Sequence, residues 1–208
     1  RFSFISEARV YRFLRWFHGP ATAMMVATQS LKRELEGHGF KNLRIWSRGV
    51  DVERFKPDGD AHLPYEGPIF LYVGRVAVEK NIEAFLALDL PGTKVVVGDG
   101  PARASLERKY PNVKFVGPKT GDELTRAYAG SDVFVFPSRT DTFGLVVLEA
   151  LACGTPVAAY PVQGPLDVIG DAPVGALDDD LQTACQKALT IDRAACRTFA
   201  LSRSWRAC

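Results

Sequence analysis

Short, mainly apolar segments alternate with longer helical ones from Ile69 onward, and this rhythm constrains the fold more than any other feature. Each apolar segment has four or five residues, which is typical of strands buried on both faces of a parallel sheet. The rhythm therefore predicts an α/β fold built on a Rossmann-like parallel sheet. The predicted strands are 69–73, 94–97, 113–116, 133–136 and 156–160, and the predicted helices lie near 80–89, 101–109, 121–130 and 144–153.

The residues before Ile69 predict a smaller unit of their own. A helical opening is followed by a short strand at 23–27, a helix and a second strand at 43–46. The residues that come next are rich in Pro, Gly and Asp, which is the composition of a linker. We therefore divide the chain into a first unit at 1–56, a linker at 57–68, a sheet domain at 69–190 and a C-terminal helical segment at 191–208.

The overall composition is that of a globular protein and excludes several classes of function. Of the 208 residues, 47% are hydrophobic and 24% are charged, enough for one large core or two small ones. The net charge of +2 is too mild to indicate a nucleic-acid partner. Because no apolar run is long enough to span a membrane and no secretory signal is visible, we expect a cytoplasmic protein.

The cysteines and histidines indicate no metal or redox site. The four cysteines lack Cys-x-x-Cys spacing and nearby histidines, and a reduced, cytosolic setting suits them. We therefore expect neither a metal ion nor a cofactor. Because the chain starts at Arg1 rather than Met, we also expect it to be a piece of a longer protein. The cysteines are Cys153, Cys185, Cys196 and Cys208.

The predicted first helix carries arginines beside aromatic residues. The arginines recur at helical spacing next to aromatic residues; they are Arg9, Arg12 and Arg15, and the aromatic residues are Phe13, Trp16 and Phe17. Two interpretations remain open. The helix either packs on its own domain, which is the commoner role, or makes a peripheral contact with the inner face of a membrane.

Glycines end the predicted strands, at the edge where open α/β sheets form their ligand crevice. Gly74 ends the first of these strands and is followed by Arg75, and Lys80 opens the next helix. The arginine offers a planar fork and the lysine a point charge to a diphosphate. The alternative is a solvated helix start, in which these charges face water.

The turn Gly98-Asp99-Gly100-Pro101 follows the second strand of the sheet domain. Its glycines permit positive φ and close approach of the backbone, which a bound nucleotide requires. The same residues suit any sharp strand-to-helix turn that has proline in the first helical turn. We favour this purely structural interpretation for the turn taken alone.

The segment from Asp141 to Glu149 predicts a loop followed by a helix that starts near Phe143. Exposed amides of Gly144 and Leu145 would attract a diphosphate, aided by the helix dipole. Glu149 would then lie roughly 9 Å along the helix axis, where a ribose would reach it, with the sugar near Asp141. The alternative is that Asp141 caps the helix and Glu149 is an ordinary helical residue. Against it, the helix is almost wholly apolar, and an ionised Glu there is costly unless partnered.

Four ordered motifs make the chain resemble the retaining GT-B glycosyltransferases of glycosyltransferase family 4. The resemblance runs from about Val26 to Pro165, and the order and distances of the motifs make it specific. The motifs are Ser47-Arg48-Gly49-Val50-Asp51 before the linker, Gly74-Arg75 with Glu79-Lys80-Asn81, Gly98-Asp99-Gly100-Pro101, and the segment that ends in Glu149.

The resemblance implies a hexosyltransferase of glycan or glycolipid biosynthesis. Its donor would be a nucleoside diphosphate sugar and its acceptor a lipid or a glycan. Arg75 and Lys80 would bind the donor diphosphate and stabilise the charge that develops on it, with retention and without a metal or covalent nucleophile. Glu149 would bind the ribose. Asp141 stands where the family has a glutamate, one methylene longer, and keeps the charge beside the donor sugar.

The remaining donor contacts that the resemblance implies come from backbone and glycine positions. They are Phe143, Gly144 and Leu145 for the phosphates and donor sugar, Val116 with Gly117 for the nucleobase, and the turns of Gly74, Gly98 and Gly100.

The resemblance also implies that most of an N-terminal acceptor domain is absent. Residues 1–56 resemble only the last part of that Rossmann-like domain, and Ser204-Trp205 resembles the start of the family's C-terminal helix. Two alternatives to a transferase remain open. One is a non-catalytic nucleotide-binding module, and the other is a GT-B type nucleotide-sugar epimerase, for which acid and base groups are not visible.

Overall fold

The computed structural model describes residues 6–141 and 143–207, and it divides the chain into two compact units between Arg48 and Gly49. This boundary lies earlier than the one that the sequence predicts after residue 56. The reason is burial: Val50 and Phe55 are 3% and 5% exposed and belong to the core of the second unit. Residues 49–56 are therefore part of the sheet domain.

The first unit is a single βαβ crossover preceded by a helix. Its two strands pair in parallel, with Met24 opposite Leu43, around a small core that includes Val26 and Leu35. Thr28 begins the second helix, because its hydroxyl accepts a hydrogen bond from the Leu31 amide at 3.1 Å. The elements are α1 (Glu7–His18), β1 (Met24–Val26), α2 (Gln29–Gly37) and β2 (Leu43–Ile45).

The second unit contains a six-stranded parallel sheet in the order β5-β4-β3-β6-β7-β8, which confirms the predicted Rossmann-like fold. The order reverses between β3 and β6, and such a switch point is where open α/β sheets bind ligands. The last strand was not predicted from the sequence. The strands are β3 (Ile69–Val73), β4 (Thr93–Val97), β5 (Lys114–Gly117), β6 (Val133–Phe136), β7 (Val157–Ala159) and β8 (Gly175–Leu177).

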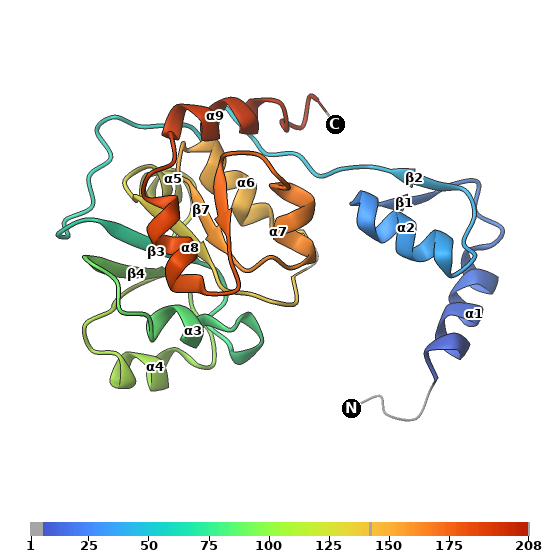
Figure 1. The fold of residues 1–208 in the computed structure, drawn as a ribbon, viewed down its shortest axis with the longest axis horizontal. Helices are drawn as coiled ribbons and strands as arrows, with labels where there is room; N and C mark the ends of the chain where they lie inside the picture. The colour runs from blue at the N-terminus through green and yellow to red at the C-terminus, as the bar shows by residue number, and fades with distance from the viewer. Residues whose placement is uncertain (1–5, 142, 208) are drawn as a thin grey trace. The chain divides into compact units, whose positions relative to one another are not determined.

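Helices cover both faces of this sheet, because side chains that alternate along each strand enter two separate cores (Figure 1). Leu71 and Phe134 point to one core, whereas Phe70 and Val133 point to the other. The first face carries α5 (Gly121–Ala129), α6 (Leu145–Ala152), α7 (Gln163–Val168) and α9 (Arg193–Leu201). The second carries α3 (Ile82–Leu86), α4 (Arg103–Lys109) and α8 (Leu181–Ala188), with a short 3-10 helix, η1 (Val78–Lys80), before α3.

Three of the four cysteines are buried in the described residues. Cys153, Cys185 and Cys196 are free thiols, and Cys208 lies outside the described residues. Burial raises the pKa of the Cys153 thiol to about 12, so it stays protonated at neutral pH.

Across the described part of the chain, no helix combines the length and apolarity needed to cross a bilayer.

Candidate functional site

The segments that follow β3 and β6 are joined at the switch point of the sheet. Nζ of Lys80 lies 2.5 Å from Oδ1 of Asp141, although 61 residues separate them. Asn81 has a left-handed backbone with φ 52°, and its Nδ2 donates to the carbonyl of Pro137 at 3.0 Å. The Lys80 and Asp141 side chains are 30% and 25% exposed, so a ligand at this edge can reach both.

Arg75 lies at the same edge and is held only loosely. Its Nη1 is 3.3 Å from Oε1 of Glu79, and both side chains are more than half exposed. Its backbone is better fixed, because the Tyr72 hydroxyl donates to the Arg75 carbonyl at 2.8 Å. Burial, and then the charges of Asp141 and Glu79, raise the pKa of Tyr72, which therefore stays a neutral donor. The backbone of Arg75 is therefore fixed, whereas its exposed guanidinium can exchange Glu79 for another partner.

The turn after β4 packs directly on the turn after β3. Gly98 has φ +139°, and a Cβ there would lie 1.9 Å from the carbonyl oxygen of Gly74. A Cβ on Gly100 would lie 2.3 Å from the carbonyl oxygen of Val76. The chain's own backbone therefore requires glycine at 98 and 100, in agreement with the structural interpretation of this turn. A nucleotide contact at these glycines stays a prediction.

The end of β5 adjoins these turns. The Gly98 amide donates to the carbonyl of Gly117 at 2.9 Å, and Gly117 itself has φ +76°. Val116 is partly exposed. The structure therefore places both residues at the same edge of the sheet as Arg75, two strands away in the order β5-β4-β3.

Helix α6 begins at Leu145, within two residues of its predicted start near Phe143 or Gly144. Gly144 precedes it with φ +74°, a left-handed conformation that glycine adopts without strain. Among the described residues no side chain caps this helix, so Asp141 pairs with Lys80 instead of capping α6. The first amides of the helix thus remain available, as an anion site requires. Thr142, within the quoted segment, lies outside the described residues.

Glu149 lines a cavity of about 190 Å³ beside α6, and Leu145 at the start of that helix lines it too. Its Oε2 accepts a hydrogen bond from the hydroxyl of Tyr128 at 2.9 Å. Burial raises the pKa of Glu149, while the Tyr128 hydrogen bond and the charge of Arg54 oppose that rise. The lining residues are Gly49, Val50, Asp51, Arg54, Phe55, Leu145, Glu149 and Trp205.

Tyr128 is thus the partner that a Glu in an apolar helix needs, and sequence reasoning missed it. The tyrosine lies on α5, 21 residues before Glu149, so no helical or strand periodicity relates the two. Tyr72 was missed for a different reason, because it reads as one more apolar residue of a buried strand.

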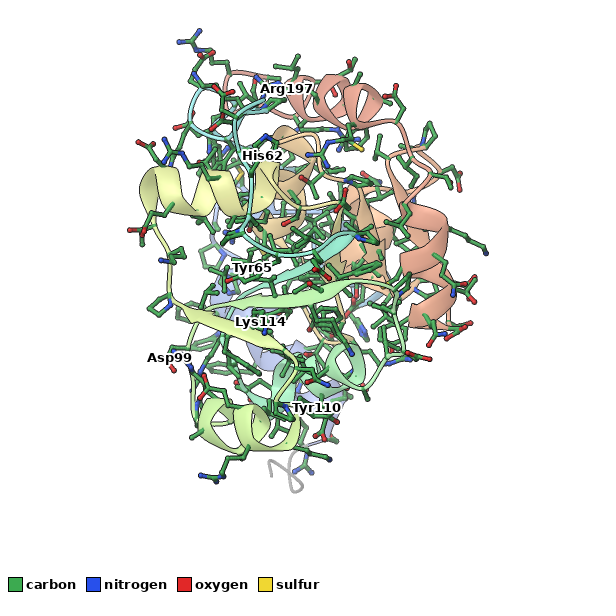
Figure 2. All side chains as sticks on the ribbon, turned by 90° about the vertical axis from the view of Figure 1, so that its left-hand side faces the viewer. His62, Tyr65, Asp99, Tyr110, Lys114 and Arg197 are labelled. Atoms are coloured by element: carbon green, nitrogen blue, oxygen red, sulfur yellow. The ribbon has the colours of Figure 1, made fainter. Side chains whose placement is uncertain are left out.

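The loop that carries Arg54 is tied to α6 by Arg197 of α9. Nη1 of Arg197 donates to the carbonyls of Phe55 and Ala152 at 2.8 and 2.9 Å, and Nη2 donates to that of Val52 at 3.0 Å. Figure 2 labels this side chain on α9. Because Ala152 ends α6, one guanidinium satisfies a helix terminus and holds two walls of the Glu149 cavity together.

The sequence is similar to a known family and to several characterised proteins. Residues 67–191 match the family described as glycosyl transferases group 1. The chain is 35% identical over 213 aligned residues to a GDP-mannose-dependent alpha-mannosyltransferase of Mycobacterium tuberculosis, covering 94% of this chain and 56% of the relative. It is also 35% identical over 180 residues to sulfoquinovosyl transferase SQD2 of Arabidopsis thaliana, covering 77% of this chain and 34% of the relative.

The fold is similar to that of sucrose-phosphate synthase from Thermosynechococcus elongatus, with a TM-score of 0.80 and 28% identity. That similarity covers 99% of this chain and 60% of the synthase. This chain therefore spans 34% to 60% of the length of these three proteins. Because the family match covers more than half of the chain, and the strand order and motifs agree with it, the chain belongs to the group 1 glycosyl transferases.

Proposed function

We propose that this chain is the donor-binding half of a retaining glycosyltransferase. The enzyme moves a hexose from a nucleoside diphosphate sugar to a lipid or glycan acceptor. The observation that carries the proposal is the convergence of Arg75, Lys80, Asp141 and the start of α6 at the switch point of one parallel sheet. The names of the two similar proteins, a GDP-mannose-dependent mannosyltransferase and a sulfoquinovosyl transferase, support glycosyl transfer and a nucleotide-sugar donor.

The diphosphate lies between two cations and a helix start in this proposal. Arg75 is exposed and Lys80 is partly exposed, and both can exchange their present carboxylate partners for phosphate oxygens. The amides of Gly144 and Leu145 add the positive end of the α6 dipole. These groups stabilise the charge that grows on the leaving diphosphate, and the proposal includes no metal ion.

The rest of the donor extends from the diphosphate in two directions. The ribose reaches Glu149 in the second turn of α6, and the nucleobase lies by Val116 and Gly117. The hexose lies by Asp141, beyond the phosphates. Transfer with retention places the acceptor on the same face of the hexose as the leaving group, so that the departing phosphate can take the acceptor's proton.

Nucleotide binding tests the site directly. We expect uridine or guanosine diphosphate to raise the thermal midpoint of the chain, and Lys80→Ala or Glu149→Ala to remove that rise. Lys187→Ala is the matched control, because Lys187 of α8 pairs with Asp178 at 2.8 Å and is 61% exposed. An unchanged midpoint with both nucleotides contradicts the proposal.

Product analysis with the full-length protein separates the alternative functions. A retaining transferase converts an α-linked donor into an α-linked product only when the acceptor is present. An epimerase changes the donor sugar with no acceptor. A binding module gives the thermal shift and no product, and would overturn the enzymatic part of the proposal.

Helix α1 supports a peripheral membrane contact as a second part of the proposal. Phe13, Trp16 and Phe17 are 57%, 73% and 63% exposed, and Arg9 and Arg12 are exposed beside them. Aromatic side chains with neighbouring cations suit the surface of an anionic bilayer. We expect the full-length protein to sediment with vesicles of anionic lipid, and replacement of Trp16 and Phe17 by Ser to abolish this. Equal sedimentation of the variant would show that α1 is not the contact.

A further inference from the structure

We propose that Tyr128 is the positioning residue of the ribose subsite. Its buried hydroxyl holds Oε2 of Glu149 at 2.9 Å and so directs the other carboxylate oxygen to the hydroxyls of a bound nucleoside. The inference rests on the proposed function, because it assumes that a nucleoside diphosphate occupies the site. Tyr128 does not line the cavity itself, so it acts on the nucleoside only through Glu149.

The ring of Tyr128 is fixed from all sides. It is completely buried, and it packs edge to face with Phe55 and Phe134, with ring centroids 6.0 and 5.6 Å away. Such aromatic contacts restrict both the position and the tilt of a ring. Its backbone is also held, because Thr155 Oγ1 donates to the Tyr128 carbonyl at 2.6 Å. The hydroxyl oxygen is therefore held in one place, within hydrogen-bond distance of Oε2 of Glu149.

Glu149 gains a defined orientation from this contact. Burial and the charge of Glu149 raise the pKa of Tyr128 well above its usual value, so the phenol remains a donor across the working pH range. With Oε2 taken, Oε1 is the oxygen left to accept. Within residues 6–141 and 143–207, no buried side-chain nitrogen or oxygen lacks a partner, so an unpaired Oε1 is open to solvent.

The cavity around Glu149 suits a diol rather than a phosphate. Its walls combine the apolar side chains of Phe55 and Leu145 with two carboxylates, those of Asp51 and Glu149. The single guanidinium in the lining, that of Arg54, lies 5.2 Å from the Phe55 ring. A carboxylate accepts hydrogen bonds from hydroxyl groups and repels phosphate oxygens. A preoriented carboxylate binds hydroxyls more tightly, because less side-chain freedom is lost on binding.

The test compares Tyr128→Phe with the wild-type chain by titration calorimetry. The ligands are the better bound of uridine and guanosine diphosphate and its dideoxy analogue, which lacks both ribose hydroxyls. We expect Tyr128→Phe to weaken the ribonucleotide about five- to tenfold and to leave the dideoxy analogue unchanged. Tyr110→Phe is the matched control, because Tyr110 donates to Oε1 of Glu83 at 3.1 Å and lies after α4, away from the α9 helix of Arg197 (Figure 2).

The outcomes separate this inference from the proposed function. If the wild-type chain binds no nucleotide, both fail. If it binds the ribonucleotide and the dideoxy analogue equally well, Glu149 does not bind the ribose. The inference and the ribose contact of the proposed function then both fail, whereas a nucleoside diphosphate donor site is still supported. Equal weakening of both ligands in Tyr128→Phe would also overturn it, since that is the result of a general structural role.

A measurement on the wild-type chain covers the case in which Tyr128→Phe does not fold. The Tyr128 hydroxyl is shielded from water, so its proton exchanges slowly enough to give a resonance. We expect that resonance to move when the ribonucleotide binds and to stay in place with the dideoxy analogue. Equal movement with both ligands would contradict the positioning role.

Discussion

Nζ of Lys80 lies 2.5 Å from Oδ1 of Asp141, and this pair connects the segments after β3 and β6 across the switch point of the sheet. The proposed contacts of the diphosphate and of the sugar therefore touch each other before a donor binds. A phosphate that binds to Lys80 must compete with the Asp141 carboxylate. A nucleotide sugar, in contrast, uses both residues.

Asp141→Asn should therefore strengthen the binding of uridine or guanosine diphosphate, since the amide no longer neutralises Lys80. We expect the binding free energy to improve by about 1 kcal/mol, because the pair is only partly buried. Calorimetry should then show roughly fivefold tighter binding. Asp178→Asn is the control, as Asp178 pairs with Lys187 at 2.8 Å on the surface. Weaker binding by Asp141→Asn would show that the carboxylate supports the nucleotide site instead of competing for it.

Gly98→Ala should destabilise the chain by at least roughly 3 kcal/mol in urea unfolding, because the new Cβ collides with backbone. The carbonyl oxygen of Gly74 lies 1.9 Å from its position. Gly121→Ala measures the cost of the backbone conformation without a steric clash. Gly121 has φ +56°, and a Cβ there would meet no other group within 4 Å. It should cost only about 1 kcal/mol. Similar losses in both variants would mean that backbone conformation alone explains the glycine at 98.

Arg197→Met should destabilise the chain by roughly 2–4 kcal/mol, because three backbone carbonyls lose a charged donor. The loop of Val52 to Phe55 should also lose protection in hydrogen exchange, since two of those carbonyls belong to it. Arg126→Met removes an exposed arginine whose nearest carboxylate is 3.7 Å away, and should change neither property. Unchanged exchange in Arg197→Met would contradict a role in holding the loop.

The stability of Glu149→Gln relative to wild type should depend on pH. Burial raises the pKa of Glu149 from its ordinary value of 4.5, so the folded state binds the proton more tightly than the unfolded state. As the pH rises from 4.5 through the raised pKa, the wild-type free energy of unfolding falls relative to that of Glu149→Gln. Chemical denaturation across this window measures the difference, which should then level off. A constant difference would show that the pKa is the same in both states.

Local sequence patterns predicted much of the fold. The first five strands of the sheet domain lie within one residue of their predicted ends, because apolar runs between turn residues leave few alternatives. Strand β8 was missed, since Gly175-Ala176-Leu177 is short and has no apolar run of its own. It is a strand because it pairs with β7, where Ala158 lies opposite Ala176.

The candidate site was predictable where topology alone brings residues together. Arg75, Lys80 and Asp141 were expected at one edge because parallel strands present their carboxyl ends on the same side. The direct contact of Lys80 with Asp141 was not expected. It depends on how the loop after β3 packs against the loop after β6, which the periodicity of the sequence does not encode.

By itself, the sequence determined the α/β class, the order of the elements and the edge at which the charged residues gather. The first two follow from apolar periodicity and turn residues, which are local. The third follows because parallel strands present their carboxyl ends on one side of the sheet. Only the tertiary structure decided the partners: Asp141 for Lys80, Tyr128 for Glu149, and three carbonyls for Arg197. The physical reason is that a buried or partly buried polar group must find a donor or acceptor in whatever element packing brings beside it, however distant in the chain.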